Sequence, residues 1–161
     1  MATEAAKVQG WDSRKKNKQF EMTREQMMNI IDEAHTCVFV RHTKDGRPVG
    51  FVVGGAAVDG EIYTVTNLLR LAIPAVEADP RCSVVFDIPG VGSVTIIGRA
   101  EVVEDDDVIR GWFESMSTKA SMVKSGAFTP EQWMERAYTP NRRLFHIIPE
   151  QWVGSDLLAL E

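Results

Sequence analysis

The sequence predicts an α+β fold, mainly β with helices, built on a six-stranded antiparallel β-barrel that is closed or split and flanked by short helices. Three observations indicate this fold. Runs of β-type residues alternate with tight Asp-Gly turns, glycines recur inside those runs, and the helical segments are short and carry their own caps. A flat open sheet of the same strands would leave long edges unpaired, so the pattern favours a barrel.

Length and charge limit the domain count and the class of partner. The chain has 161 residues and a net charge of −5. We therefore expect a mobile N-terminal arm over residues 1–20 and a single domain over residues 21–161. The acidic balance argues against nucleic-acid binding, and no stretch approaches the roughly 20 apolar residues of a membrane span. The two cysteines, Cys37 and Cys82, lie in separate apolar runs, which predicts buried thiols and a cytoplasmic protein.

The strands are predicted from β-branched and aromatic runs that are bounded by turn residues. They cover Thr36–Thr43, Pro48–Ala57, Glu61–Thr66, Arg81–Asp87, Ser93–Val103 and Arg142–Ile148. The glycines Gly50, Gly54 and Gly55 in the second run have two explanations, either strong curvature of a barrel strand or the close approach of a ligand to the backbone. Gly98 in the fifth run is a candidate bend.

Helices are predicted from their N-terminal signals. Thr23 with Gln26, and Thr129 with Gln132, have the spacing of capping boxes, and a helix after the second box should end near Tyr138. Pro74 should open a helix in the crossover over residues 68–78. The acidic run at residues 105–107 is interpreted as a helix cap, because consecutive carboxylates do not converge on one metal ion.

The most chemically suggestive segment follows the third strand. Thr64 and Thr66 alternate on one face, Asn67 leaves the strand, and Arg70 follows, so hydroxyls and a guanidinium form a possible phosphate cradle. The alternative is an ordinary strand end with turn residues. The sequence has no nucleophile elbow, P-loop or dinucleotide fingerprint, and it predicts neither a catalytic residue nor a metal site.

From Ala34 to Val103 the order of elements resembles the flavin split-barrel superfamily, which includes pyridoxamine 5'-phosphate oxidase-like and deazaflavin-dependent proteins. The similarity rests on short segments in a matching order, and each segment is degenerate alone. They are Asp45-Gly46-Arg47-Pro48, the strand Ile62–Thr66, Asp79-Pro80-Arg81, the run Gly98-Arg99-Ala100-Glu101-Val102, and the C-terminal Ile148-Pro149-Glu150-Gln151-Trp152.

The resemblance implies a Greek-key split barrel that forms a homodimer with its cofactor at the interface. The implied cofactor is FMN, with a deazaflavin coenzyme or haem as alternatives. The implied function is flavin-dependent hydride transfer to a small organic substrate; the alternatives are a deazaflavin-dependent reductase and a non-catalytic binder of haem or another planar ligand. The implied cofactor-binding residues are Arg47, Val49, Phe51, Val52, Thr64, Val65, Thr66, Asn67 and Arg70, together with Trp152 from the other subunit. Many members have a phosphate-binding lysine where this chain has Leu71 and Ala72, so Arg70 would take that role.

Overall fold

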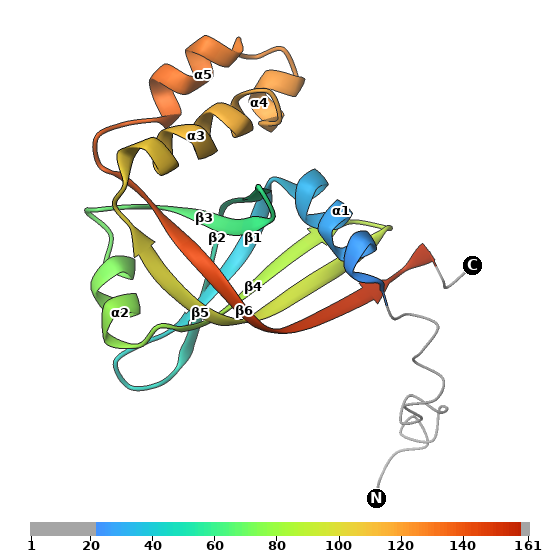
Figure 1. Ribbon diagram of the computed structural model, residues 1–161, viewed down its shortest axis with the longest axis vertical. Coiled ribbons are helices and arrows are strands. Elements are labelled where there is room, and N and C mark those ends of the chain that lie inside the picture. Colours follow the sequence, from blue (N-terminus) through green and yellow to red (C-terminus); the bar gives the residue numbers. More distant parts are fainter. Residues whose placement is uncertain (1–21, 159–161) are drawn as a thin grey trace, which may run out of the picture.

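Six antiparallel strands close into a barrel in the order β1-β2-β3-β6-β5-β4, and β4 pairs back onto β1 (Figure 1). The computed structural model describes residues 22–158, so the predicted arm of residues 1–20 lies outside the described residues. The strands are β1 (Thr36–His42), β2 (Pro48–Val58), β3 (Glu61–Asn67), β4 (Arg81–Ile88), β5 (Gly92–Val103) and β6 (Arg142–Asp156). Two three-stranded meanders are thus joined by one crossover, which confirms the predicted six-stranded Greek-key barrel.

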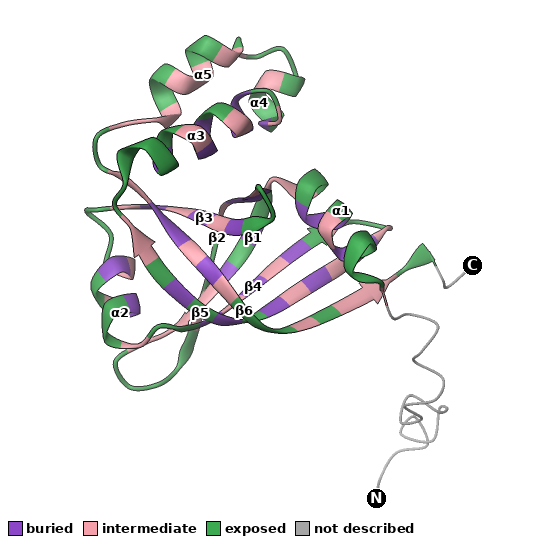
Figure 2. Ribbon diagram, viewed as in Figure 1, coloured by how far each residue is buried: buried purple, intermediate pink, exposed green. Residues whose placement is uncertain are grey.

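Alternating side chains fill the inside of the barrel. Along β4 and β5 buried residues alternate with partly exposed ones, as the banding of these strands in Figure 2 shows. Phe86, Val94, Ile96 and Ile147 are fully buried, and each such side chain contributes roughly 1.5–3 kcal/mol of burial free energy. The free thiols of Cys37 and Cys82 are buried in the same core, as predicted, and burial raises the pKa of each to about 12.

The glycines of β2 are explained by close packing inside the protein. A Cβ on Gly55 would lie 2.5 Å from Sγ of Cys37, and a Cβ on Gly54 would lie 3.1 Å from Val65. Side chains of the chain itself therefore occupy the space that a larger residue would need.

The last strand is longer than predicted. The sequence indicated an end at Ile148, because proline cannot donate a ladder hydrogen bond, but β6 continues through Pro149 to Asp156. A bulge between Ile97 and Gly98 accommodates the proline, which pairs with Gly98. The prediction of a bend at Gly98 was therefore right, whereas the predicted strand end was wrong.

The helices are α1 (Arg24–Ala34), α2 (Ala72–Ala78), α3 (Asp106–Ser117), α4 (Ser121–Lys124) and α5 (Pro130–Ala137). Both predicted capping boxes are present, and Asp105 caps α3 through the backbone N–H groups of Asp107 and Val108. α2 begins two residues before Pro74, which still lies in the first turn, where an N–H has no helical partner. None of the helices within residues 22–158 has the length and apolarity to cross a membrane.

Helices α3, α4 and α5 lie together on one side of the barrel (Figure 1). Trp112 and Phe113 of α3 are 2% exposed and pack with Ala56 of β2 and Leu144 of β6. This second apolar cluster is separate from the barrel core, to which α1 and α2 contribute their buried side chains. The helices α3–α5 therefore lie on the outer wall of the barrel, whereas α2 adjoins the candidate functional site.

Candidate functional site

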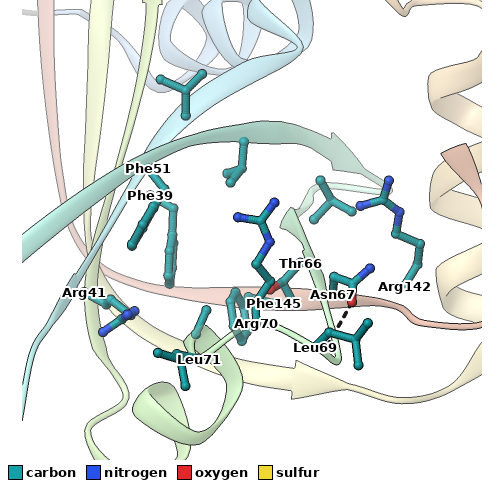
Figure 3. Close-up of a pocket in the computed structure, with 14 residues that line it drawn as sticks. Phe39, Arg41, Phe51, Thr66, Asn67, Leu69, Arg70, Leu71, Arg142 and Phe145 are labelled. Carbon is teal, nitrogen blue, oxygen red and sulfur yellow. Dashed lines mark hydrogen bonds between the residues drawn. The ribbon is translucent and has the colours of Figure 1, made fainter.

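A cavity of about 570 Å³ opens between the β1–β2 hairpin, the end of β3, the loop before α2 and the start of β6 (Figure 3). Its volume falls within the range of about 300–1,000 Å³ that small-molecule and cofactor sites occupy. The cavity is lined by Phe39, Arg41, Phe51, Val52, Val53, Val65, Thr66, Asn67, Leu69, Arg70, Leu71, Ala72, Arg142 and Phe145.

A tight turn at the end of β3 positions the polar residues on one side of this cavity. The Asn67 side-chain oxygen accepts a hydrogen bond from the Leu69 N–H at 2.9 Å, and the Asn67 carbonyl accepts one from the Arg70 N–H at 2.9 Å. Arg142 on β6 pairs in register with Asn67, so its side chain joins the same region. We call Thr66, Asn67, Arg70 and Arg142 the β3–α2 corner.

Aromatic rings form the apolar wall. Phe39 of β1 and Phe145 of β6 stack with their ring centroids 5.0 Å apart, and both are almost fully buried. Phe51 of β2 is more open, with 39% of its surface exposed. The site therefore combines planar apolar surface with hydrogen-bond donors, which suits a ligand that has an aromatic ring system and a polar tail.

The cavity is strongly positive although the chain as a whole carries a net charge of −5. Three arginines line it, Arg41, Arg70 and Arg142, and no aspartate or glutamate is among the described lining residues. A cleft lined by one sign of charge concentrates ligands of the opposite sign. The geometry therefore selects for anionic ligands.

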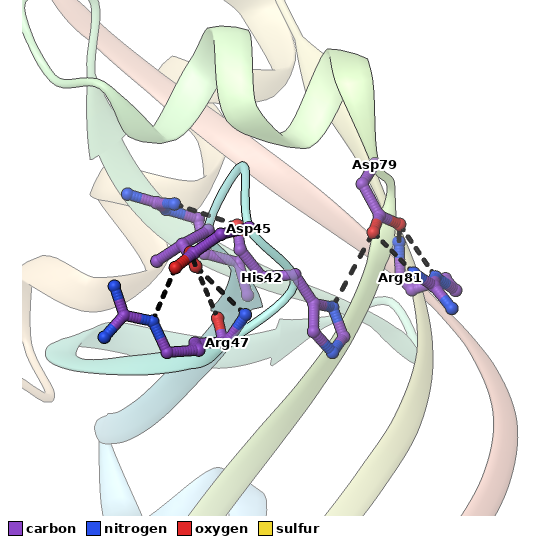
Figure 4. Close-up of polar contacts among 7 residues, drawn as sticks. His42, Asp45, Arg47, Asp79 and Arg81 are labelled. Carbon is purple, nitrogen blue, oxygen red and sulfur yellow. Dashed lines mark hydrogen bonds and ion pairs between the residues drawn. The ribbon is translucent and has the colours of Figure 1, made fainter.

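Asp45 in the β1–β2 turn and Asp79 before β4 pair with arginines that do not line the cavity (Figure 4). The Asp79 carboxylate accepts two hydrogen bonds from Arg81, at 2.9 and 2.7 Å, and this pairing lowers the pKa of Asp79 to about 2. Asp45 accepts a hydrogen bond from Nε of Arg47 at 2.7 Å and another from the Thr43 hydroxyl, which lowers its pKa. These two carboxylates are therefore engaged by arginines outside the cavity lining.

The structure gathers six of the ten predicted cofactor-binding residues around the cavity. They are Phe51, Val52, Val65, Thr66, Asn67 and Arg70. Their role in binding stays a prediction, but their common location is now observed. Thr66 is 9% exposed and shares the inward face of β3 with Thr64, as the alternation indicated.

Four predicted residues lie away from the cavity lining. Thr64 is fully buried, and its hydroxyl has no hydrogen-bond partner within residues 22–158. Arg47 is on the exposed hairpin with Asp45, and Val49 is half-buried beside it on β2. Trp152 of β6 contacts the guanidinium of Arg24 of the same chain, with Cζ 3.5 Å from the ring centroid. Its predicted role across a dimer interface stays a prediction.

Several lining residues were missed by the sequence analysis, notably Phe39, Arg41, Arg142 and Phe145. Arg41 carried a usable signal, because Cys37, Phe39 and Arg41 alternate on one face of β1 and an arginine continues a buried series there. Arg142 and Phe145 carried none, because they are 75 and more residues from Asn67 in sequence and only the β3–β6 pairing brings them to the site.

Comparison with known proteins supplies the family. The family model described as pyridoxamine 5'-phosphate oxidase matches residues 23–155, most of the chain. The chain belongs to the pyridoxamine 5'-phosphate oxidase family. This confirms the superfamily that the sequence motifs indicated, and it covers the whole barrel, including β6 and the inserted helices α3–α5. The sequence has no significant match among curated proteins.

Solved structures share the fold at low sequence identity. A conserved hypothetical protein of Mycobacterium tuberculosis has a TM-score of 0.69 and 20% identity, over 89% of this chain and 90% of its own. An FAD and heme binding protein of Mycobacterium smegmatis has a TM-score of 0.63 and 17% identity, over 86% and 73%. An F420 reductase has a TM-score of 0.61 and 12% identity, over 81% and 98%. These similarities show a common barrel fold.

Proposed function

We propose that the protein is a flavin-dependent oxidoreductase that binds FMN in the cavity and catalyses hydride transfer to a small organic substrate. The observation that carries this proposal is a cavity of cofactor size with three arginines, aromatic walls and no carboxylate in its described lining. Membership of the pyridoxamine 5'-phosphate oxidase family also supports FMN binding, since the fold of this family binds flavins. The buried, unpaired thiols fit a cytoplasmic location.

The residues present fit the two ends of FMN. The β3–α2 corner would hold the phosphate, with the Arg70 guanidinium and the Thr66 hydroxyl as donors. Phe51, Val52 and Val53 of β2 would lie against the ring system. Bound FMN would supply the hydride chemistry itself, so this chain needs to bind, orient and shield rather than to provide an acid–base pair.

We further propose that two copies of the chain enclose the cofactor. A stripe of four valines and one threonine crosses the outer wall in register, from strand to strand: Val52, Val38, Val85, Thr95 and Val153. Val52 is 77% exposed and belongs also to the cavity lining, so the stripe is continuous with the cavity rim. Val38, Val52 and Val153 are exposed, and exposed apolar side chains grouped beside a ligand site are typical of an interface.

Titration of the purified protein with FMN tests the proposal directly. We expect FMN fluorescence to be quenched on binding, and Arg70→Ala to weaken binding by about tenfold or more, because a charge-assisted hydrogen bond contributes roughly 1.5–3 kcal/mol. Arg99→Ala is the matched control. Arg99 lies on β5, pairs with Glu150 of β6 and does not line the cavity. A protein that binds no FMN, or an Arg70→Ala variant that binds it equally well, would contradict the proposal.

A deazaflavin coenzyme is the second candidate. Three arginines exceed what one phosphate requires, and one structural neighbour is an F420 reductase. Parallel titrations with FMN and the deazaflavin coenzyme separate the two candidates, and tighter binding of FMN would remove the second.

Haem is less suited to the cavity, because no histidine, cysteine, methionine or tyrosine is among the described lining residues to ligate its iron.

A further inference from the structure

Lys124 of α4 and His35 at the end of α1 bring a nucleophilic and a basic side chain together outside the candidate site. Nζ of Lys124 lies 2.9 Å from Nε2 of His35, although the two residues are 89 positions apart in the sequence. α4 and the end of α1 lie side by side (Figure 1). Neither residue lines the cavity. A nucleophile within hydrogen-bond reach of a base is the arrangement that activates side chains for covalent chemistry.

The backbone and the packing around His35 hold its ring in place for this contact. His35 follows α1 with a left-handed backbone, and its carbonyl accepts a hydrogen bond from the Gly55 N–H of β2 at 3.2 Å. Its Nδ1 atom is buried and has no hydrogen-bond partner within residues 22–158, whereas Nε2 faces Lys124. A neutral ring that accepts a hydrogen bond at Nε2 carries its proton on Nδ1. The ring nitrogen that can take up a proton is therefore the one beside the lysine.

The charged groups around His35 keep its imidazole neutral. Burial lowers the pKa of His35, and the positive charge of Lys124 lowers it further. Lys119 acts in the same direction, whereas Asp32 and Glu33 at the end of α1 oppose it. The ring is thus unprotonated at neutral pH and can serve as a base. Lys119 and Lys124 also place two positive charges on this surface, and these attract an anionic reagent.

The other histidines of the described chain contact acids instead of lysines. Within residues 22–158, His42 faces Asp79 at 3.8 Å and His146 faces Glu61 at 2.6 Å. Lys44 is exposed in the β1–β2 turn, and none of the hydrogen bonds of these residues joins it to a histidine. Lys44 is therefore a lysine of the same chain that lacks the feature on which Lys124 depends.

We propose that Lys124 is a site of acylation by acyl phosphates, with His35 as the base. Neutral Nζ attacks the carbonyl carbon of the acyl phosphate, an N–C bond forms, and the bond from that carbon to the phosphate oxygen breaks. The phosphate leaves with the electron pair of that bond. Nε2 of His35 takes up the proton that Nζ loses and passes it to the departing phosphate. The nitrogen becomes acidic as the N–C bond forms, so a base weaker than a lysine amine is sufficient.

The product of this step is an amide at Nζ of Lys124. Acylation removes one positive charge from the surface and turns the charge-assisted hydrogen bond to His35 into a neutral one. The modification would therefore weaken the contact between α4 and the end of α1. It goes beyond the proposed function, because it involves neither the cavity nor a cofactor.

Mass spectrometry of the full chain treated with acetyl phosphate tests the proposal. At about pH 8 we expect Lys124 to be acetylated about tenfold faster than Lys44 or more, because a positioned base accelerates proton transfer. His35→Asn keeps a residue that tolerates a positive φ but takes up no proton, and it should bring Lys124 to the rate of Lys44. His146→Asn is the matched loss of a histidine elsewhere and should leave both rates unchanged.

A neutral acyl donor, N-acetoxysuccinimide, separates the action of the base from attraction of an anion. The preference for Lys124 over Lys44 should persist with this reagent, since it depends on His35. A preference that occurs only with acetyl phosphate would come from charge attraction and would overturn the role of His35. Equal rates at the two lysines of the natural protein, or a His35→Asn variant that keeps the preference, would overturn the proposal. These outcomes are independent of FMN binding, so the proposed function is tested separately.

Discussion

At the scale of single residues, Gly98 is the position where one methyl group would disturb the barrel most. A Cβ there would lie 2.1 Å from the carbonyl oxygen of Ile148 and 3.2 Å from the backbone nitrogen of Glu150. These neighbours are backbone atoms of the bulge, so they cannot rotate away as a side chain would. We expect Gly98→Ala to lower the free energy of unfolding by about 1–3 kcal/mol, measured by urea denaturation.

Gly111 offers a matched control for this substitution. It lies inside α3, and a Cβ on it would meet nothing within 4 Å. Gly111→Ala should therefore raise the free energy of unfolding by about 0.5–1 kcal/mol, because alanine loses less backbone entropy in a helix. Equal stability of the Gly98→Ala and natural proteins would show that the β5–β6 bulge relaxes more easily than its geometry indicates.

At the scale of elements, His35 joins α4 to the corner between α1 and β1. Its Nε2 lies 2.9 Å from Nζ of Lys124, and its backbone is left-handed, with φ of 54°. Burial lowers the pKa of His35, and the positive charges of Lys124 and Lys119 lower it further, against the opposite effect of Asp32 and Glu33. The neutral imidazole is thus the form that accepts the Lys124 hydrogen bond.

This pKa shift predicts a loss of stability on acidification. A histidine whose pKa is lowered by folding takes up a proton more readily in the unfolded chain, so stability is retained above about pH 6.5 and falls below it. His35→Asn keeps a residue that tolerates a positive φ but does not titrate. Urea denaturation should show the natural protein more stable than His35→Asn at about pH 7.5, and the difference should shrink at about pH 5.5. A difference that is constant or grows on acidification would contradict this assignment.

The elements also show which features the sequence could predict. Capping boxes and Asp-Gly turns are local signals, so the starts of α1 and α5 and the β1–β2 turn were predicted correctly. The four-residue helix α4 is too short to have a periodic pattern, and it was missed. The extension of β6 beyond Pro149 depends on a bulge with Gly98, 51 residues earlier, and no local pattern encodes such a pairing.

The candidate site was predicted in part for the same reason. Residues from Val65 to Arg70 are contiguous, and their polar pattern could be recognised in the sequence. The positive charge of the cavity is non-local, because Arg41 and Arg142 come from strands at the two ends of the domain. Sequence reasoning therefore located the polar residues Thr66, Asn67 and Arg70 that line the cavity, and missed Arg41 and Arg142.

At the scale of the whole molecule, the charge of the cavity lining is opposite in sign to the net charge of the chain. The chain carries −5 overall, yet the cavity at the candidate site concentrates three arginines beside an apolar rim. Leu69 and Leu71 on this rim are 83% and 80% exposed, and they line the same cavity as Val52 of the stripe. A second copy that covers this rim would remove water from around the arginines and strengthen their interaction with an anionic cofactor.

The proposed enclosure of the cavity by two copies can be tested at Val38. Val38 lies in the stripe between Val52 and Val85, and does not line the cavity. We expect the natural protein to sediment as a dimer at micromolar concentration. Val38→Asp should shift it toward monomer, because a carboxylate in an apolar contact must be desolvated, and should weaken FMN binding in parallel.

Met122→Asp separates this effect from a general response to an added charge. Met122 is 51% exposed on α4, among the helices that lie on the outer wall rather than on the stripe. This variant should remain dimeric and keep the FMN affinity of the natural protein. If Val38→Asp is monomeric yet binds FMN as tightly as the dimer does, one chain forms the complete site. If the natural protein and Val38→Asp are both monomers, the stripe has another partner. A coupled loss of dimer and affinity, confined to Val38→Asp, would support a cofactor site enclosed by two copies.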